Sequence, residues 1–93
     1  MAGYIIARID VTNPEGMKAY QEAVPAAVEA AGGKYLVRGG KVYGPDPDGR
    51  RLVVLEFPSK EAAKAFWNSD TYQDIAKLRQ GHATMDAVVV EGV

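Results

Sequence analysis

The sequence contains no cysteine and a single histidine, His82. Without thiols the chain forms no disulfide, thiolate nucleophile, iron–sulfur cluster or cysteine zinc site, and one histidine excludes a histidine-rich metal centre. No apolar run approaches the roughly 20 residues of a membrane-spanning helix. The 11 basic residues do not exceed the 12 acidic ones, whereas binding to a phosphate backbone requires a basic excess. We therefore expect no cofactor, no membrane partner and no nucleic acid partner.

The composition is that of an ordinary globular protein. The chain has 93 residues, of which 47% are hydrophobic and 25% are charged. This length predicts one domain over residues 1–93, with no room for a second core. The first strand is expected to begin at Gly3 with no charged leader before it, so a cytoplasmic location is predicted.

Four segments are rich in β-branched and aromatic residues that alternate along the chain, which is typical of strands. They are Gly3–Val11, Lys34–Arg38, Arg51–Phe57 and Ala83–Val90. The third is apolar on both faces except at Glu56, so both of its faces are expected to be buried. A Gly- and Pro-rich connection with a turn at Asp48 and Gly49 joins the second and third strands into a hairpin.

Three helical segments are predicted between these strands. The first begins with Asn13 as N-cap and Pro14 in the first turn, and ends at Gly32, with a kink expected at Pro25. The second is capped by Ser59, and a third piece begins at Ser69 and ends at Gly81.

The element order β-α-β-β-α-β predicts an α+β, ferredoxin-like sandwich. In this prediction the first and third strands are parallel neighbours at the centre of the sheet, and the helices cover one face only. The other face carries a set of mainly apolar side chains: Tyr4, Ile6, Leu52, Val54, Val88 and Val90. Because this is too much apolar surface to leave in water, we expect a homodimer that closes an α/β barrel.

Four motifs together resemble a known family. They are YLVRGG at Tyr35 to Gly40, VVLEFPS at Val53 to Ser59, FWNSDTYQDIAKLR at Phe66 to Arg79, and VVVEG at Val88 to Gly92. The chain is similar to a small bacterial family classed as a domain of unknown function, within the dimeric α+β-barrel superfamily. That superfamily includes antibiotic-biosynthesis monooxygenases, muconolactone isomerases and haem-degrading enzymes. The resemblance implies a fold and a dimer, and it transfers no activity.

Parallel pairing of the first and third strands would place Arg8 beside Glu56 on the face away from the helices. A polar cluster is then expected at one end of the barrel, formed by Arg8, Asp10, Glu56, Thr84 and Asp86, together with Arg38 or His82. One interpretation is a ligand pocket with Glu56 as general base and Arg8 holding an anionic or carbonyl group. The alternative is an internal ion pair that closes the barrel or the dimer.

Tyr20, Trp67 and Tyr72 occupy the inner faces of the predicted helices. They would line a cleft between sheet and helices and stack on a planar ligand, although a simple core role also explains such spacing. His82 follows a helix end, where it suits a proton-transfer role or a contact with the helix dipole.

Two functions fit these features. The first is a cofactor-independent enzyme for a small, partly apolar carbonyl or aromatic compound, with Glu56, Arg8 and His82 as catalytic residues. Its ligand-binding residues would be Tyr4, Asp10, Tyr20, Arg38, Trp67, Tyr72 and Asp86. The second is a non-catalytic dimeric module that binds a small molecule or is associated with stress.

Overall fold

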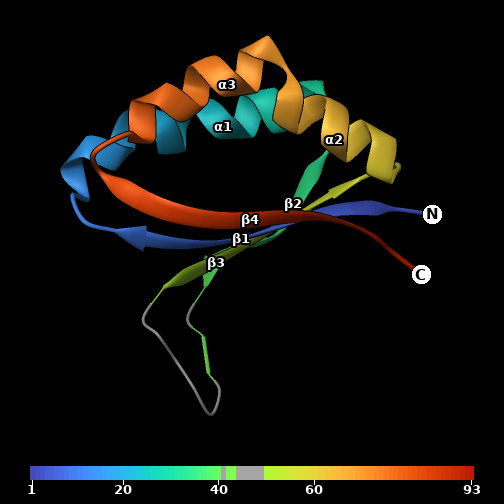
Figure 1. Ribbon diagram of the computed structural model, residues 1–93, viewed down its shortest axis with the longest axis horizontal. Coiled ribbons are helices and arrows are strands. Elements are labelled where there is room, and N and C mark those ends of the chain that lie inside the picture. Colours follow the sequence, from blue (N-terminus) through green and yellow to red (C-terminus); the bar gives the residue numbers. More distant parts are fainter. Residues whose placement is uncertain (41, 44–49) are drawn as a thin grey trace.

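Helices lie on only one face of a four-stranded sheet (Figure 1). The structure, a computed structural model, describes residues 1–40, 42–43 and 50–93. The strands are β1 (Gly3–Val11), β2 (Lys34–Gly40), β3 (Arg51–Phe57) and β4 (Ala83–Glu91). The helices are η1 (Glu15–Met17), α1 (Lys18–Ala30), α2 (Lys60–Asn68), α3 (Asp70–Ala76) and η2 (Lys77–Arg79). The predicted turn at Asp48 and Gly49 lies outside the described residues.

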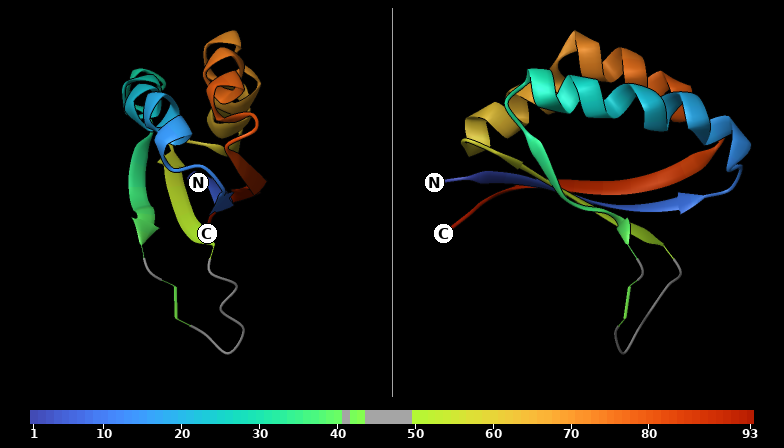
Figure 2. Two further views of the ribbon diagram at one scale, coloured as in Figure 1. Left: turned by 90° about the vertical axis from the view of Figure 1, so that its left-hand side faces the viewer. Right: turned by 180° about the vertical axis from the view of Figure 1, so that it is seen from behind.

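This element order confirms the predicted α+β, ferredoxin-like βαββαβ sandwich. The predicted strands begin at the residues observed, but β2 extends two residues further, to Gly40, and β4 one residue further, to Glu91. Helix α1 lies over the β2 side of the sheet, and α2 and α3 lie over the β4 side (Figure 2). No helix of the described ranges is long and apolar enough to cross a membrane.

The sheet has the order β2-β3-β1-β4, and every neighbouring pair is antiparallel. The first and third strands are adjacent, as predicted, but the prediction that they are parallel is wrong. The β1-α1-β2 crossover makes β1 and β2 run in the same direction, whereas β2 and β3 form an antiparallel hairpin. Since β3 lies between β1 and β2, it must run opposite to both.

The core lies between the sheet and the helices. Alternate residues of β1 and β3, including Ile5, Ile9, Leu55 and Phe57, point toward the helices and are buried. Aromatic rings continue this layer: the Phe57 and Phe66 centroids are 5.2 Å apart, and those of Phe66 and Tyr72 are 5.0 Å apart. This apolar layer supplies most of the driving force for folding.

The first helix begins and ends only partly as the sequence predicts. Asn13 Oδ1 accepts a hydrogen bond from the Gly16 amide at 3.4 Å, but the first turn is a 3-10 helix and α1 itself begins at Lys18. Helix α1 continues through Pro25. Gly32 follows its end with a φ of 82°, a left-handed conformation that glycine adopts without strain.

Ser69 joins α2 to α3 and sets the start of the helix that carries Tyr72. Its hydroxyl accepts a hydrogen bond from the Tyr72 amide at 3.1 Å and donates one to the Phe66 carbonyl at 2.7 Å. One side chain therefore caps the N-terminus of α3 and satisfies a carbonyl at the end of α2.

We expect Ser69→Ala to lower the free energy of unfolding by about 1 to 2 kcal/mol, because both helix ends lose a partner. Urea denaturation monitored by circular dichroism measures this change. Thr71→Ala, in the exposed first turn of α3, is the matched control and should change stability by less than about 0.5 kcal/mol. Equal effects of the two substitutions would refute the double capping role.

Candidate functional site

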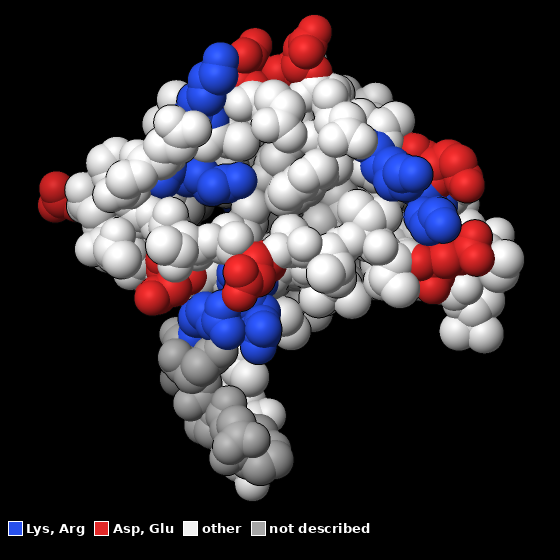
Figure 3. Space-filling model, in the orientation of Figure 1, with Lys and Arg blue, Asp and Glu red and all other residues white. Residues whose placement is uncertain are grey.

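A cavity of about 250 Å³ lies between the sheet and the helices. Its walls are mostly apolar and aromatic, and they are formed by β1, α1, the facing residues of β2 and β3, α2, α3 and Met85 of β4. The space-filling view shows a hollow between the two layers (Figure 3). Since an apolar cavity of about 150 Å³ holds a benzene molecule, this cavity is large enough for one substituted ring.

Two buried tyrosines from different helices meet at this cavity. The hydroxyls of Tyr20, in α1, and Tyr72, in α3, are 2.9 Å apart, and the two residues are 8% and 3% exposed. In such a pair one hydroxyl hydrogen is shared between the two oxygens, and the other remains available for a further acceptor. The pair is therefore a hydrogen-bond donor in a mostly apolar space.

Burial raises the pKa of the Tyr20 phenol well above its usual value of 10, and the neighbouring Tyr72 raises it further. The positive charge of Arg79 opposes this shift in part. At neutral pH Tyr20 is therefore a neutral phenol, which donates a hydrogen bond and does not act as a base.

Aromatic rings form one wall of the cavity. The Tyr72 ring centroid lies 5.0 Å from that of Trp67 and 5.0 Å from that of Phe66. The sequence correctly placed Tyr20, Trp67 and Tyr72 together between sheet and helices. Their predicted contact with a planar ligand stays a prediction.

Arg79 is a residue of this region to which the sequence analysis assigned no role. Its guanidinium carbon lies 5.9 Å from the Tyr20 ring centroid. Its Nε is buried and has no hydrogen-bond partner among the described residues. Arg79 follows Tyr72 by seven residues, about two helical turns, and this spacing was the signal that could have identified it.

The β2 strand brings Arg38 to the cavity through an irregular pairing with β3. Tyr35 lies opposite Leu55 and Arg38 lies opposite Val53, with register shifts after Tyr35 and after Arg38. Both Tyr35 and Arg38 therefore face the helices, together with Arg51 of β3, and all three line the cavity. Arg38 does not belong to a cluster on the opposite face, which corrects that part of the prediction.

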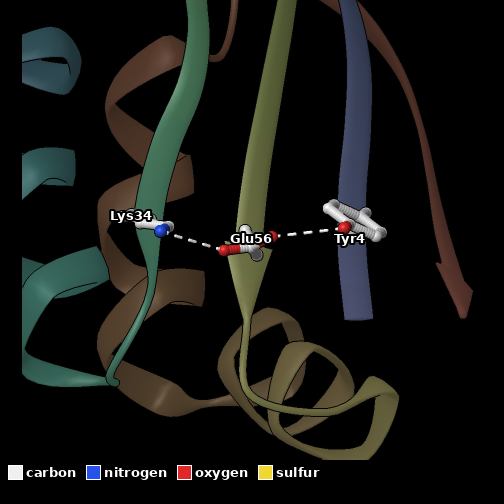
Figure 4. A network of polar contacts seen from close by, with 3 residues as sticks. All are labelled: Tyr4, Lys34 and Glu56. Carbon is white, nitrogen blue, oxygen red and sulfur yellow. Dashed lines mark hydrogen bonds and ion pairs between the residues drawn. The ribbon is translucent and has the colours of Figure 1, made fainter. Parts of the chain in front are cut away.

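The antiparallel register also corrects the predicted pairing of Arg8 with Glu56. On the β3 side of β1, Tyr4 lies opposite Glu56 and Arg8 lies opposite Leu52. On the β4 side, Arg8 lies opposite Asp86. Glu56 accepts a hydrogen bond from the Tyr4 hydroxyl at 3.2 Å and forms an ion pair with Lys34 at 3.2 Å (Figure 4). These contacts lie on the sheet face away from the helices, and the hydrogen bond to Glu56 raises the pKa of Tyr4.

The remaining polar residues form a second group at the other end of this face. Asp10 lies opposite Thr84, and Asp86 forms an ion pair with Arg50 at 2.6 Å. The single polar cluster expected from the sequence is therefore divided in two.

His82 lies in the turn before β4. Its ring Nδ1 is 3.2 Å from the side-chain nitrogen Nδ2 of Asn13. Its backbone carbonyl accepts hydrogen bonds from the backbone amides of Thr12 and Asn13. The position after a helix end agrees with the sequence. The structure does not bring His82, Arg8 and Glu56 together, and their catalytic roles stay predictions.

The chain belongs to the family described as Domain of unknown function (DUF1330), which it matches over residues 2–93. A comparison with curated proteins gave no significant match. The family match over residues 2–93 confirms the resemblance inferred from the four motifs.

Several solved structures share the fold. A protein of unknown function from Rhodopseudomonas palustris is 18% identical, with a TM-score of 0.75 over 99% of this chain and 82% of the other. A dimeric ferredoxin-like protein of unknown function from Jannaschia sp. CCS1 is 13% identical, with a TM-score of 0.70 over 99% and 100%. SnoaB, a cofactor-independent oxygenase from Streptomyces nogalater, is 13% identical, with a TM-score of 0.63 over 99% and 93%. At these identities the likeness establishes the fold alone.

The raised pKa of Tyr20 predicts a specific dependence of stability on alkaline pH. In the unfolded chain this phenol ionises near pH 10, whereas in the folded chain it ionises only at a higher pH. The contribution of Tyr20 to the free energy of unfolding is therefore complete below pH 10 and is lost as the pH rises toward the folded pKa. We expect the stability difference between the native protein and Tyr20→Phe to shrink between about pH 9 and pH 11.

Urea unfolding of the native protein and of Tyr20→Phe at about pH 9 and about pH 11 measures this difference in stability. Tyr43→Phe, which removes a fully exposed hydroxyl, is the matched control. If the stability difference between the native protein and Tyr20→Phe stays constant or grows with pH, the pKa of Tyr20 is not raised in the folded chain.

Proposed function

We propose that the cavity binds a small, planar, largely apolar compound with a carbonyl or phenol oxygen. The observation that supports this proposal is the Tyr20–Tyr72 hydroxyl pair, buried in an aromatic-lined space with one hydrogen available to donate. Ligand sites in proteins combine such apolar walls with a few fixed polar groups. In this proposal the ring lies against Trp67 and its oxygen accepts from the tyrosine pair. A cytoplasmic location, predicted from the sequence, is part of the proposal.

Binding without catalysis is the function that the lining residues favour. Among the described residues that line the cavity there is no carboxylate and no histidine, so the cavity offers donors and no general base. Glu56 and His82 make their contacts elsewhere.

A cofactor-independent enzyme is the second candidate, and the same hydroxyl pair favours it. Donors fixed at an oxygen stabilise negative charge that develops there during a reaction. Such an enzyme would act on a compound acidic enough to lose its proton without a base in the cavity. SnoaB has the same fold and is a cofactor-independent oxygenase. Conversion of a bound compound would assign this second function, and unchanged recovery would favour binding.

Binding is testable because Trp67 is the single tryptophan and lines the cavity. We expect acetophenone, phenol and phenylacetamide to give saturable changes in Trp67 fluorescence. Tyr72→Phe should weaken the binding of acetophenone by up to about tenfold, because one hydrogen bond contributes about 0.5 to 1.5 kcal/mol.

Ala7→Leu, which extends a buried wall residue into the cavity, should abolish these changes. Ala19→Leu, on the exposed side of α1, is the matched control and should bind normally. The proposal is wrong if none of the three compounds gives a saturable change, or if Ala7→Leu binds as well as Ala19→Leu.

We also propose that two chains associate through the open face of the sheet. Val88 is 60% exposed and Val90 is 41% exposed, and Ile6, Leu52 and Val54 are only partly buried beside them. Covering such a surface with a second copy removes apolar area from water. The Jannaschia protein of the same fold is described as dimeric, which supports this arrangement.

Light scattering after gel filtration should give about twice the chain mass of 10.0 kDa. Val88→Lys should shift the protein toward the monomer, because it places a charge within the contact. Leu78→Lys, at a residue 42% exposed in the helical layer, is the control and should stay dimeric. A native protein that is monomeric at micromolar concentration would refute the dimer.

A further inference from the structure

We propose that the ligand of the cavity carries a carboxylate, which Arg38 and Arg51 bind at the cavity mouth. This inference rests on the proposed function and specifies the class of ligand: a monocyclic compound with an acidic side chain.

The first of two irregularities in the β2–β3 pairing turns Arg38 toward the cavity. In a regular strand Tyr35 and Arg38, three positions apart, would point to opposite faces. The register shift at Leu36 adds one unpaired residue, so Tyr35 and Arg38 share the helix-facing side. A second shift at Gly39 follows at once. β-Bulges are common beside functional sites because they redirect single side chains.

Gly39, at the second shift, lies beside Arg51. Its φ of 70° lies in the left-handed region that side-chain-bearing residues rarely adopt. A Cβ at this position would lie 3.6 Å from Cδ of Arg51, an ordinary van der Waals distance, so the Arg51 stem lies next to the glycine. Arg38, Gly39 and Arg51 all line the cavity, so the two arginines lie in the same part of its wall.

The contacts of Arg38 hold its guanidinium in place and leave most of its donors available. Its guanidinium carbon lies 5.0 Å from the Tyr35 ring centroid, and Nη2 donates to the Gln21 carbonyl at 3.3 Å. A guanidinium has five N–H donors in a planar fork that matches the two oxygens of a carboxylate. A group held by one carbonyl and one ring face can still bind a carboxylate.

The charge of the lining favours an anion. Among the described residues that line the cavity, Arg38 and Arg51 are the only charged ones. No carboxylate of the described residues forms an ion pair with either arginine, whereas the adjacent Arg50 pairs with Asp86 on the opposite face. Two positive groups beside a low-dielectric cavity attract an anion more strongly than they would in water.

The experiment compares phenylacetate with phenylacetamide, which have similar shapes and differ in charge. Trp67 fluorescence gives the dissociation constants. We expect phenylacetate to bind about tenfold more tightly than the amide, with an affinity that falls as salt rises. Arg38→Gln and Arg51→Gln should each weaken phenylacetate binding by about threefold to tenfold and leave amide binding unchanged. Arg50→Gln makes the same change in net charge on the other sheet face and is the matched control.

Each outcome separates this inference from the proposed function. If the amide binds as tightly as the acid, or only the amide binds, the carboxylate assignment is wrong and the cavity remains a binding site. If Arg50→Gln weakens phenylacetate binding as much as Arg38→Gln, the effect comes from net charge, and the assignment to the mouth is wrong. If neither compound binds, and acetophenone and phenol also fail, the proposed function fails and this inference with it.

Discussion

The antiparallel pairing of β1 with β3 is the constraint on which the rest of the structure depends. It aligns the alternate apolar residues of the two central strands, such as Ile5 with Leu55 and Ala7 with Val53, on the face beneath the helices. These pairs form the floor of the cavity. The same register places Glu56 beside Tyr4 and away from Arg8. Because one residue of slippage would exchange the two faces of a strand, this pairing determines both the apolar floor and the position of the polar groups on the other face.

The outer part of the site follows a different physical rule. The centre of the sheet pairs regularly, whereas β2 at its edge pairs with two register shifts. An edge strand has a partner on one side only, so it accommodates bulges at a lower cost than a central strand does. The regular centre therefore provides the apolar floor and Arg51 of β3, and the irregular edge turns Arg38 of β2 toward the same cavity. A single chain of this size obtains both properties from one sheet.

The sequence predicted most of the elements because local signals determine them. Alternation marked the strands, and Ser59 and Ser69 marked two helix starts that the structure confirms. Strand direction is absent from such patterns, since an alternating strand looks the same in a parallel and an antiparallel pair. The Arg8–Glu56 pair was therefore placed wrongly. The bulge at Leu36 also left no mark in the sequence, and the glycine pair at Gly39 and Gly40 was a weak sign of the second one. Tyr20 and Tyr72 were predicted to be on inner helix faces, but their 2.9 Å contact depends on how α1 and α3 pack together.

The cavity itself has a thermodynamic consequence. Protein interiors are usually packed as densely as organic crystals, and unfilled apolar space forfeits dispersion contacts along its walls. A chain of 93 residues has only a small core with which to offset such a loss. The lining nevertheless includes Ala7 at a central position of β1, where a larger side chain would extend into the space. A compound that binds the folded chain alone stabilises it in proportion to RT ln(1 + [L]/Kd). The compound proposed for the cavity would add dispersion contacts along its walls, and its binding would therefore raise the free energy of unfolding.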